Sequence, residues 1–184
     1  MVLKRSLTIG VLLLLFAPPE TRADNRQKMT GYVIYGQTWD ALRREMDAKG
    51  PKGFYGWTRY EINWRFKWSE TPVSCRLTSV DVDTDIEIVM PEWRDRPRSG
   101  RALQWHWRRF YDDLLEHEKE HARMVLAGAA EIRRGLTALD ERASCFQLET
   151  EANQLGHQIL ERVKRENEQF DAETDHGRKS GTAW

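Results

Sequence analysis

Two stretches of the chain alternate between apolar and polar side chains, a pattern typical of strands with one buried face. In residues 58–68 the aromatic and aliphatic side chains occupy even-numbered positions, whereas residues 80–90 alternate Val and Ile with acidic side chains. The polar positions are mostly basic in the first stretch and acidic in the second, so we expect the two strands to pair antiparallel. A short apolar run, residues 32–35, predicts one more strand. It follows a polar segment, residues 24–30, that we expect to be frayed.

Helical periodicity replaces this alternation in the second half of the chain. A short helix is predicted earlier, at residues 39–48, with Thr38 as its N-cap. Apolar side chains then recur every three or four residues over about 101–139 and again over about 140–168. The last segment, residues 170–184, is polar and is expected to be irregular. We therefore predict an α+β fold in which a small antiparallel sheet packs on a long helical hairpin.

The N-terminus has the three-part pattern of a secretory signal peptide. Lys4 and Arg5 precede an apolar run over residues 7–17, and small side chains permit cleavage after Ala23. A membrane anchor is the alternative, but this run is short for a span of about 20 residues. We expect residues 1–23 to be removed, leaving residues 24–184 as one exported domain, periplasmic or secreted, without stable insertion in a membrane.

Composition and charge narrow the classes of partner. The 29 basic residues balance the 29 acidic ones, so we expect no nucleic-acid partner and no polybasic membrane binding, since both need a cationic surface. The charged segment at residues 94–101 is more simply explained as a solvated loop than as a binding patch. With 40% hydrophobic and 32% charged residues, the chain has the composition of a soluble globular domain.

The chain contains two cysteines, Cys75 and Cys145. An isolated pair in an oxidising compartment is most simply a disulfide, with two buried free thiols as the alternative. The bridge would close a loop of about 70 residues, which contributes about 4 kcal/mol in the chain-entropy model.

Residues 117–121 read His-Glu-Lys-Glu-His, the H-E-x-x-H pattern of zinc hydrolases. His117 and His121 are about one helical turn apart, so both imidazoles can bind one Zn²⁺, and Glu118 can take the proton of an attacking water. Both histidines fall on the apolar stripe of their helix, where imidazoles need partners. Two core histidines bonded to carbonyls or carboxylates are the alternative, but the spacing around a glutamate favours zinc.

A catalytic zinc site usually has three protein ligands and one open position. The third ligand is expected to be His176, because its polar Thr-Asp-His-Gly turn could fold back over the helix that carries the first two. His106 and His157 lie off the apolar stripes of their helices and are less suitable. Asp175 and Glu149 are the alternative ligands.

Together these features predict a zinc metallopeptidase whose substrate is a protein or peptide. Tyr35, Tyr111 and His157 are candidate donors to the oxyanion formed during hydrolysis. Two other functions stay open. The protein could be a zinc-stabilised binding or scaffold domain that uses its aromatic sheet face, or an amidase or peptidase acting on cell-wall peptides.

The ordered set of motifs resembles a bacterial family of predicted secreted zinc-dependent proteases, domain of unknown function 922. The similar stretches, spread over nearly all of residues 24–184, are Tyr32–Thr38, Gly56–Tyr60, Trp64–Phe66, Cys75, Met90–Trp93, His117–His121, Cys145 and Phe170–Gly177. The resemblance implies an exported zincin-type metallohydrolase with His117 and His121 as ligands and Glu118 as base. It also implies that the Thr-x-His-Gly turn is functional, which supports His176.

Overall fold

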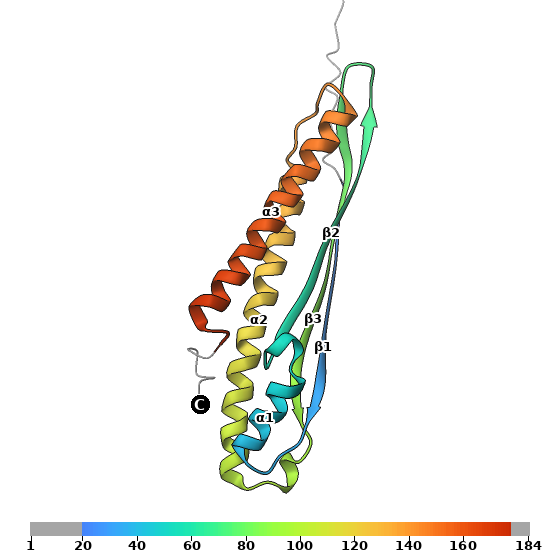
Figure 1. Ribbon diagram of the computed structural model, residues 1–184. Coiled ribbons are helices and arrows are strands. Elements are labelled where there is room, and N and C mark those ends of the chain that lie inside the picture. Colours follow the sequence, from blue (N-terminus) through green and yellow to red (C-terminus); the bar gives the residue numbers. More distant parts are fainter. Residues whose placement is uncertain (1–19, 178–184) are drawn as a thin grey trace, which may run out of the picture.

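Three long strands form one sheet, and two long helices lie along one of its faces (Figure 1). The structure is a computed structural model and describes residues 20–177. Its main elements are β1 (Glu20–Ile34), α1 (Trp39–Lys49), β2 (Trp57–Glu70), β3 (Cys75–Trp93), α2 (Arg101–Thr137) and α3 (Cys145–Thr174). Short 3-10 helices, η1 and η2, occupy Pro51–Gly53 and Arg96–Arg98. The predicted α+β class is confirmed.

The sheet is mixed, which corrects the predicted antiparallel arrangement. The strand order is β1-β3-β2; β2 pairs antiparallel with β3, as expected, but β1 pairs parallel with it. The tight turn between β2 and β3 permits only antiparallel pairing. By contrast, β1 reaches β3 through α1 and β2, and this long connection allows the two strands to run in the same direction.

The strand β1 includes the polar segment that was expected to be frayed, so that expectation was wrong. Its polar side chains find partners on β3: Arg26 lies 3.5 Å from Asp85, and Lys28 lies 3.6 Å from Glu87. On the other side of β3, Arg59 of β2 also pairs with Glu87. The outer face of the sheet is thus an acidic central strand between two strands that carry basic side chains, as predicted for β2 and β3.

The expected signal peptide and the expected irregular tail lie only partly within the described residues. Residues 1–19 of the expected signal peptide lie outside the described residues, and the expected cleavage after Ala23 falls within β1. Residues 178–184 of the expected irregular tail also lie outside them. The first part of that tail, Phe170–Thr174, is instead the last turn of α3. No helix among residues 20–177 is both long and apolar enough to cross a bilayer.

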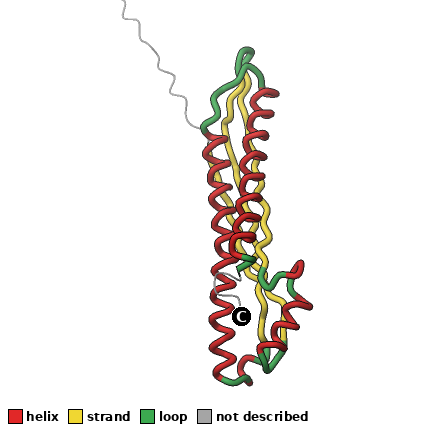
Figure 2. The backbone as a smooth tube through the Cα atoms, turned by 60° about the vertical axis from the view of Figure 1, so that its left-hand side comes forward, coloured by secondary structure: helices red, strands yellow, loops and turns green. Residues whose placement is uncertain are grey.

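The core lies between the sheet and the helices (Figure 2). The even-numbered side chains of β3 and the predicted stripe of α2 are buried there, including Ile86, Phe110 and Leu114. The expected disulfide is present between Cys75, at the start of β3, and Cys145, at the start of α3. The helix α3 therefore begins covalently fixed to the sheet and runs back along α2, which brings its last turns beside the middle of α2.

Candidate metal centre

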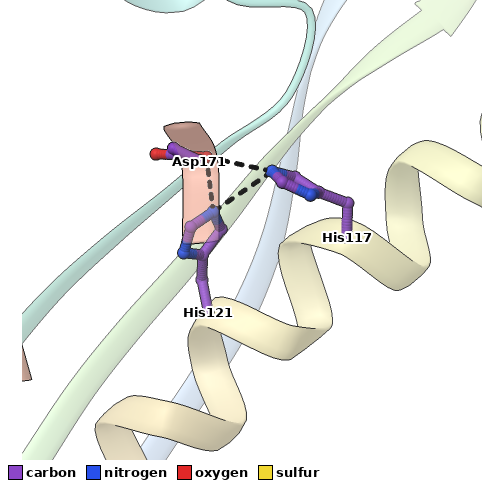
Figure 3. Close-up of side chains that lie close together, drawn as sticks. All are labelled: His117, His121 and Asp171. Atoms are coloured by element: carbon purple, nitrogen blue, oxygen red, sulfur yellow. Dashed lines mark hydrogen bonds and ion pairs between the residues drawn. The ribbon is translucent and has the colours of Figure 1, made fainter. Parts of the chain in front are cut away.

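Two histidines of α2 and one aspartate of α3 meet where the two helices lie side by side (Figure 3). His117 and His121 are buried, and the Asp171 carboxylate points between them from the last turn of α3. The two Nε2 atoms are 3.2 Å apart, and Asp171 Oδ1 lies 3.1 Å from His117 Nε2 and 3.0 Å from His121 Nε2. The three atoms form a nearly equilateral triangle.

This triangle cannot be a set of three hydrogen bonds. An imidazole Nε2 carries at most one hydrogen, and an ionised carboxylate can only accept. If both nitrogens donate to Asp171, two donors face each other across the 3.2 Å contact. If one nitrogen donates to the other, the accepting nitrogen has no hydrogen for Asp171. A cation bound by all three atoms would satisfy them at once.

The dimensions of the triangle suit zinc. With bonds of about 2.0–2.1 Å and tetrahedral angles, two ligand atoms of zinc lie about 3.3–3.4 Å apart. The observed separations of 3.0–3.2 Å are slightly shorter. Two imidazoles and one carboxylate are also a ligand set that zinc accepts, with one position left open. The residues present therefore fit the metal.

A hydrogen bond fixes the tautomer of His121. Its Nδ1 lies 2.7 Å from Asn167 Oδ1, and Asn167 Nδ2 donates to the carbonyl of Val163 at 2.7 Å. The second bond orients the amide so that its oxygen faces the imidazole, which makes His121 Nδ1 the donor. The neutral ring then has its lone pair on Nε2, directed at the triangle, as a metal ligand requires.

His117 is held mainly by packing. Its ring stacks on Phe170, with centroids 4.8 Å apart and planes inclined by 18°. Its Nδ1 is buried and has no hydrogen-bond partner in the described part of the chain. The position of this ring therefore depends on the aromatic surface of α3 instead of on a hydrogen bond.

The charge states of the triangle follow from its contacts. Burial alone would raise the pKa of the Asp171 carboxyl, but the contacts with His117 and His121 hold it well below its usual range. Burial likewise disfavours a charged His121, yet Asp171, Asn167 and Glu118 together raise the pKa of its imidazole. The site thus stabilises positive charge between the two helices, which is the property that a bound cation needs.

Glu118 lies beside the triangle, and Thr58 and Gly56 contact its side chain. Its side chain is buried, and the Thr58 hydroxyl lies 2.8 Å from Oε2 and 3.0 Å from the Glu118 carbonyl oxygen. A Cβ atom at Gly56 would lie 2.7 Å from Glu118 Oε1, so only glycine leaves room for the carboxylate there. Burial raises the pKa of Glu118, although Thr58 and the histidines oppose this shift. A carboxylate so placed is suited to accept a proton.

These groups open into a cavity of about 430 Å³. One wall comes from α2 and α3, and the other from β2 and the loop that precedes it. The lining residues are Asp47, Lys52, Gly53, Phe54, Tyr55, Gly56, Trp57, Thr58, Tyr60, Leu114, His117, Glu118, His121, Lys164, Asn167, Glu168, Asp171 and His176. The triangle and Glu118 thus line one and the same cavity.

The model of a bacterial family, DUF922, described as a bacterial protein of unknown function, matches residues 29–177. The chain belongs to the DUF922 family. Searches among curated proteins and among solved structures gave no match. The DUF922 segment includes the triangle, Glu118 and the turn at His176, so the whole candidate centre lies within it. The description of DUF922 states no function.

In this DUF922 chain the expected third ligand, His176, lies near the triangle without belonging to it. The described His, Cys, Asp and Glu side chains whose ligand atoms all lie within 4.8 Å of one another are His117, His121 and Asp171. His176 Nδ1 is 3.6 Å from Asp171 Oδ1. Of the alternative ligands, Asp175 is exposed in the turn after α3. Glu149 is exposed in the first turns of α3, about 33 Å along the helix from Asp171.

The three candidate oxyanion donors do not line the cavity. Tyr35 is 53% exposed after the end of β1, and the Tyr111 hydroxyl faces Met29 Sδ at 3.9 Å. His157 packs edge-on against Trp64, with ring centroids 5.0 Å apart. The lining of the cavity includes other side chains that carry polar hydrogens, among them Tyr60, Lys164 and His176.

Sequence reasoning missed Asp171 and Asn167, the two polar side chains that α3 contributes to the centre. Both lie on the buried stripe of that helix, which continues at every fourth residue from Ile159 through Val163. Asn167 lies inside the expected helix, and extending the same spacing beyond the expected helix end at residue 168 would have placed Asp171 on the same helical face. The polar composition after residue 168 obscured that signal.

Proposed function

We propose that this DUF922 protein is an exported zinc-dependent metallopeptidase. The observation that carries the proposal is the triangle of His117, His121 and Asp171 in one cavity with Glu118. Three protein ligands and an adjacent carboxylate are the parts of a catalytic zinc site. Export, by a signal peptide at residues 1–23, is consistent with the disulfide, because such bridges persist in oxidising compartments.

Three side chains would hold the metal: His117 and His121 through Nε2, and Asp171 through Oδ1. Asp171 takes the place expected for His176, because its oxygen completes the triangle. Asn167 would keep His121 in the metal-binding tautomer, and Phe170 would orient His117. Zinc bound there would act as a Lewis acid and lower the pKa of a water to about 7.

Glu118 is the general base of the proposed reaction. It would take a proton from the attacking water and later give a proton to the amine that leaves. Burial favours this role because a carboxylate with a raised pKa holds the proton more firmly between the two steps. Thr58 and Gly56 would position the carboxylate, the first by a hydrogen bond and the second by leaving space.

Zinc content tests the ligand set directly. In the protein expressed from its full sequence, we expect one zinc per chain, lost in His117→Ala and Asp171→Asn. Asp175→Asn is a matched control, because Asp175 is a nearby exposed aspartate and asparagine tolerates its left-handed conformation. Elemental analysis after dialysis gives the stoichiometry. A protein without zinc, even after incubation with it, would favour the scaffold alternative and contradict the proposal.

Glu118→Gln separates hydrolysis from metal binding. The amide keeps the size of the side chain but cannot act as a base, so we expect zinc to stay and hydrolysis to fall by about 10²–10⁴-fold. The assay compares release of peptides from labelled casein and from peptidoglycan fragments, which also distinguishes a protein substrate from a cell-wall substrate. Unchanged hydrolysis in the variant would exclude Glu118 as the base.

A further inference from the structure

We propose that His176 binds the oxyanion of the substrate at this centre and is not a metal ligand. The inference rests on the proposed function and adds to it a residue that contacts the reacting oxygen. It is carried by three observations, which concern the place of the ring, the backbone that holds it and the surface against which it packs.

The His176 ring lies beside the triangle, in the lining of the cavity and partly exposed to solvent. Its Nδ1 is 3.6 Å from Asp171 Oδ1, beyond the 3.0–3.1 Å that separate this oxygen from the other two imidazoles. Its side chain is 47% exposed, whereas those of His117 and His121 are 2% and 9% exposed. The ring therefore borders the triangle, lines the same cavity and is also open to solvent.

The backbone that carries this ring has an unusual conformation. Asp175 and His176 both have left-handed φ angles, 50° and 51°, and neither is glycine. Non-glycine residues in this conformation are uncommon and concentrate at functional sites. Two bonds close the turn: His176 N–H donates to the Asp171 carbonyl at 2.8 Å, and Gly177 N–H donates to the Thr174 hydroxyl at 3.3 Å. The turn thus returns the chain toward Asp171, and the ring with it.

The opposite wall of the cavity fixes the ring. His176 packs on Phe54, with centroids 4.6 Å apart. The loop that carries Phe54 is itself anchored, because the Tyr32 hydroxyl donates to the Tyr55 carbonyl at 2.7 Å and the Tyr55 hydroxyl donates to Asp47 at 2.8 Å. A ring held between α3 and this loop is preorganised, which is what makes a single hydrogen bond to an oxyanion effective.

The ligand role fits these observations less well. Asp171 already supplies the third ligand atom, and His176 as a fourth protein ligand would close the position that catalysis needs. In the proposed step, water adds to the peptide carbonyl carbon, its proton goes to Glu118, and the carbonyl π electrons move onto the oxygen. An N–H of His176 donates to that oxygen. When the electrons return, the C–N bond breaks and the leaving nitrogen takes the proton from Glu118.

Binding of a small tetrahedral anion tests this role without a known substrate. We would load the full-length protein with Co²⁺ and titrate it with methylphosphonate while recording the visible spectrum of the bound cobalt. Methylphosphonate carries no peptide side chain, so its binding does not depend on the unknown sequence preference of the cavity. In His176→Ala and His176→Gly we expect cobalt stoichiometry to be unchanged and methylphosphonate to bind about tenfold or more weakly. The glycine variant suits the left-handed backbone, so it removes the ring without adding strain.

His157→Ala is the matched control, because His157 is a histidine of α3 outside the cavity, and this variant should bind methylphosphonate like the unaltered protein. Loss of cobalt from both His176 variants would make His176 a ligand and overturn the inference while leaving a metal centre. Equal methylphosphonate affinity in all proteins, or no spectral response in the unaltered protein, would also overturn it. Failure of the unaltered protein to bind Co²⁺ or Zn²⁺ would instead refute the proposed function itself.

Discussion

The two imidazoles of the centre are held by different kinds of contact. His121 has a hydrogen-bond partner, Asn167, whereas His117 stacks on Phe170 and its buried Nδ1 has no hydrogen-bond partner among residues 20–177. Hydrogen-bonded partners of metal-binding histidines fix the tautomer and increase the basicity of the ligand nitrogen. We therefore expect two residues of α3 to contribute most to the proposed zinc affinity: Asp171 as a ligand, and Asn167 through its hydrogen bond to His121.

Asn167→Leu removes this support while keeping a side chain of similar size. We expect zinc affinity to fall about 10–100-fold, because His121 loses the acceptor that holds its proton on Nδ1. Competition with a chromogenic chelator measures the affinity. Asn153→Leu is the control: Asn153 lies on the same helix and accepts a bond from Trp64 Nε1 at 3.1 Å, so its loss should affect stability and leave zinc binding unchanged. Equal zinc affinities in the Asn167 variant and the unaltered protein would contradict this role.

At the scale of single residues, the sequence predicted the part of the centre that is local. His117, Glu118 and His121 belong to one helical turn, so their spacing is sufficient to place them on one side of α2. Asp171 is 50 residues beyond His121 along the chain, and no spacing rule connects the two. Its contribution depends on how α3 packs on α2, which a single sequence does not specify.

Among the elements, α2 lacks a side-chain cap at its N-terminus. Its N-cap is Gly100, with φ −63° and ψ 149° and no side-chain bond to the free N–H groups of the first turn. That turn also lacks an acidic residue. The conformation is one that any L-residue adopts, and a Cβ atom there would meet nothing within 4 Å. The long helix that carries the candidate centre can therefore be stabilised at this end.

Gly100→Ser supplies the missing cap. Its hydroxyl can accept from an N–H of the first turn, and the side chain restricts the unfolded chain, so we expect a gain of about 0.5–1 kcal/mol in the free energy of unfolding. Urea denaturation measures the change. Gly100→Ala shares the effect on the unfolded chain but has no cap, so it should be less stable than the serine variant. If alanine stabilises as much as serine, capping is not the cause.

The element boundaries were predicted well where the hydrophobic periodicity is strong. They were predicted poorly where a segment forms a strand only because a neighbouring strand pairs with it. Thr38 caps α1 as expected, and β2 and β3 follow the two alternating stretches. Most of β1 is polar, and it forms a strand because β3 offers acidic side chains to Arg26 and Lys28 and a full row of backbone partners. Its parallel direction likewise follows from the connection through α1 and β2, which no local pattern encodes.

In the molecule as a whole, α3 is attached to its neighbours at both ends, by a disulfide at its start and by polar contacts with α2 near its end. At its start, Cys145 is bonded to Cys75 of β3, and the backbone of Arg142 exchanges two hydrogen bonds with Cys75, at 2.7 and 2.9 Å. Near its end, Asn167 and Asp171 contact the histidines of α2. These two attachments are about 39 Å apart along the helix, so they should contribute independently to stability.

Removal of the disulfide in Cys75→Ala/Cys145→Ala tests that independence. We expect the free energy of unfolding to fall by about 2–5 kcal/mol, because the unfolded chain loses a cross-link over a long loop. Zinc binding should be retained, since the ligands lie at the other end of α3 and the backbone bonds at Cys75 persist. The same concentration of free zinc, about 100 times the Kd of the unaltered protein, should then stabilise both proteins by about 2.7 kcal/mol.

Denaturation in urea, with and without zinc, gives the four free energies of this comparison. Asp171→Asn is the control in which zinc should add nothing, because a ligand atom is lost while the disulfide is intact. Equal increments in the two zinc-binding proteins would mean that each attachment holds α3 separately. A smaller zinc increment in the disulfide-free protein would mean that the centre needs the distant bridge to keep α3 in register with α2, so that the disulfide supports the site as well as the fold.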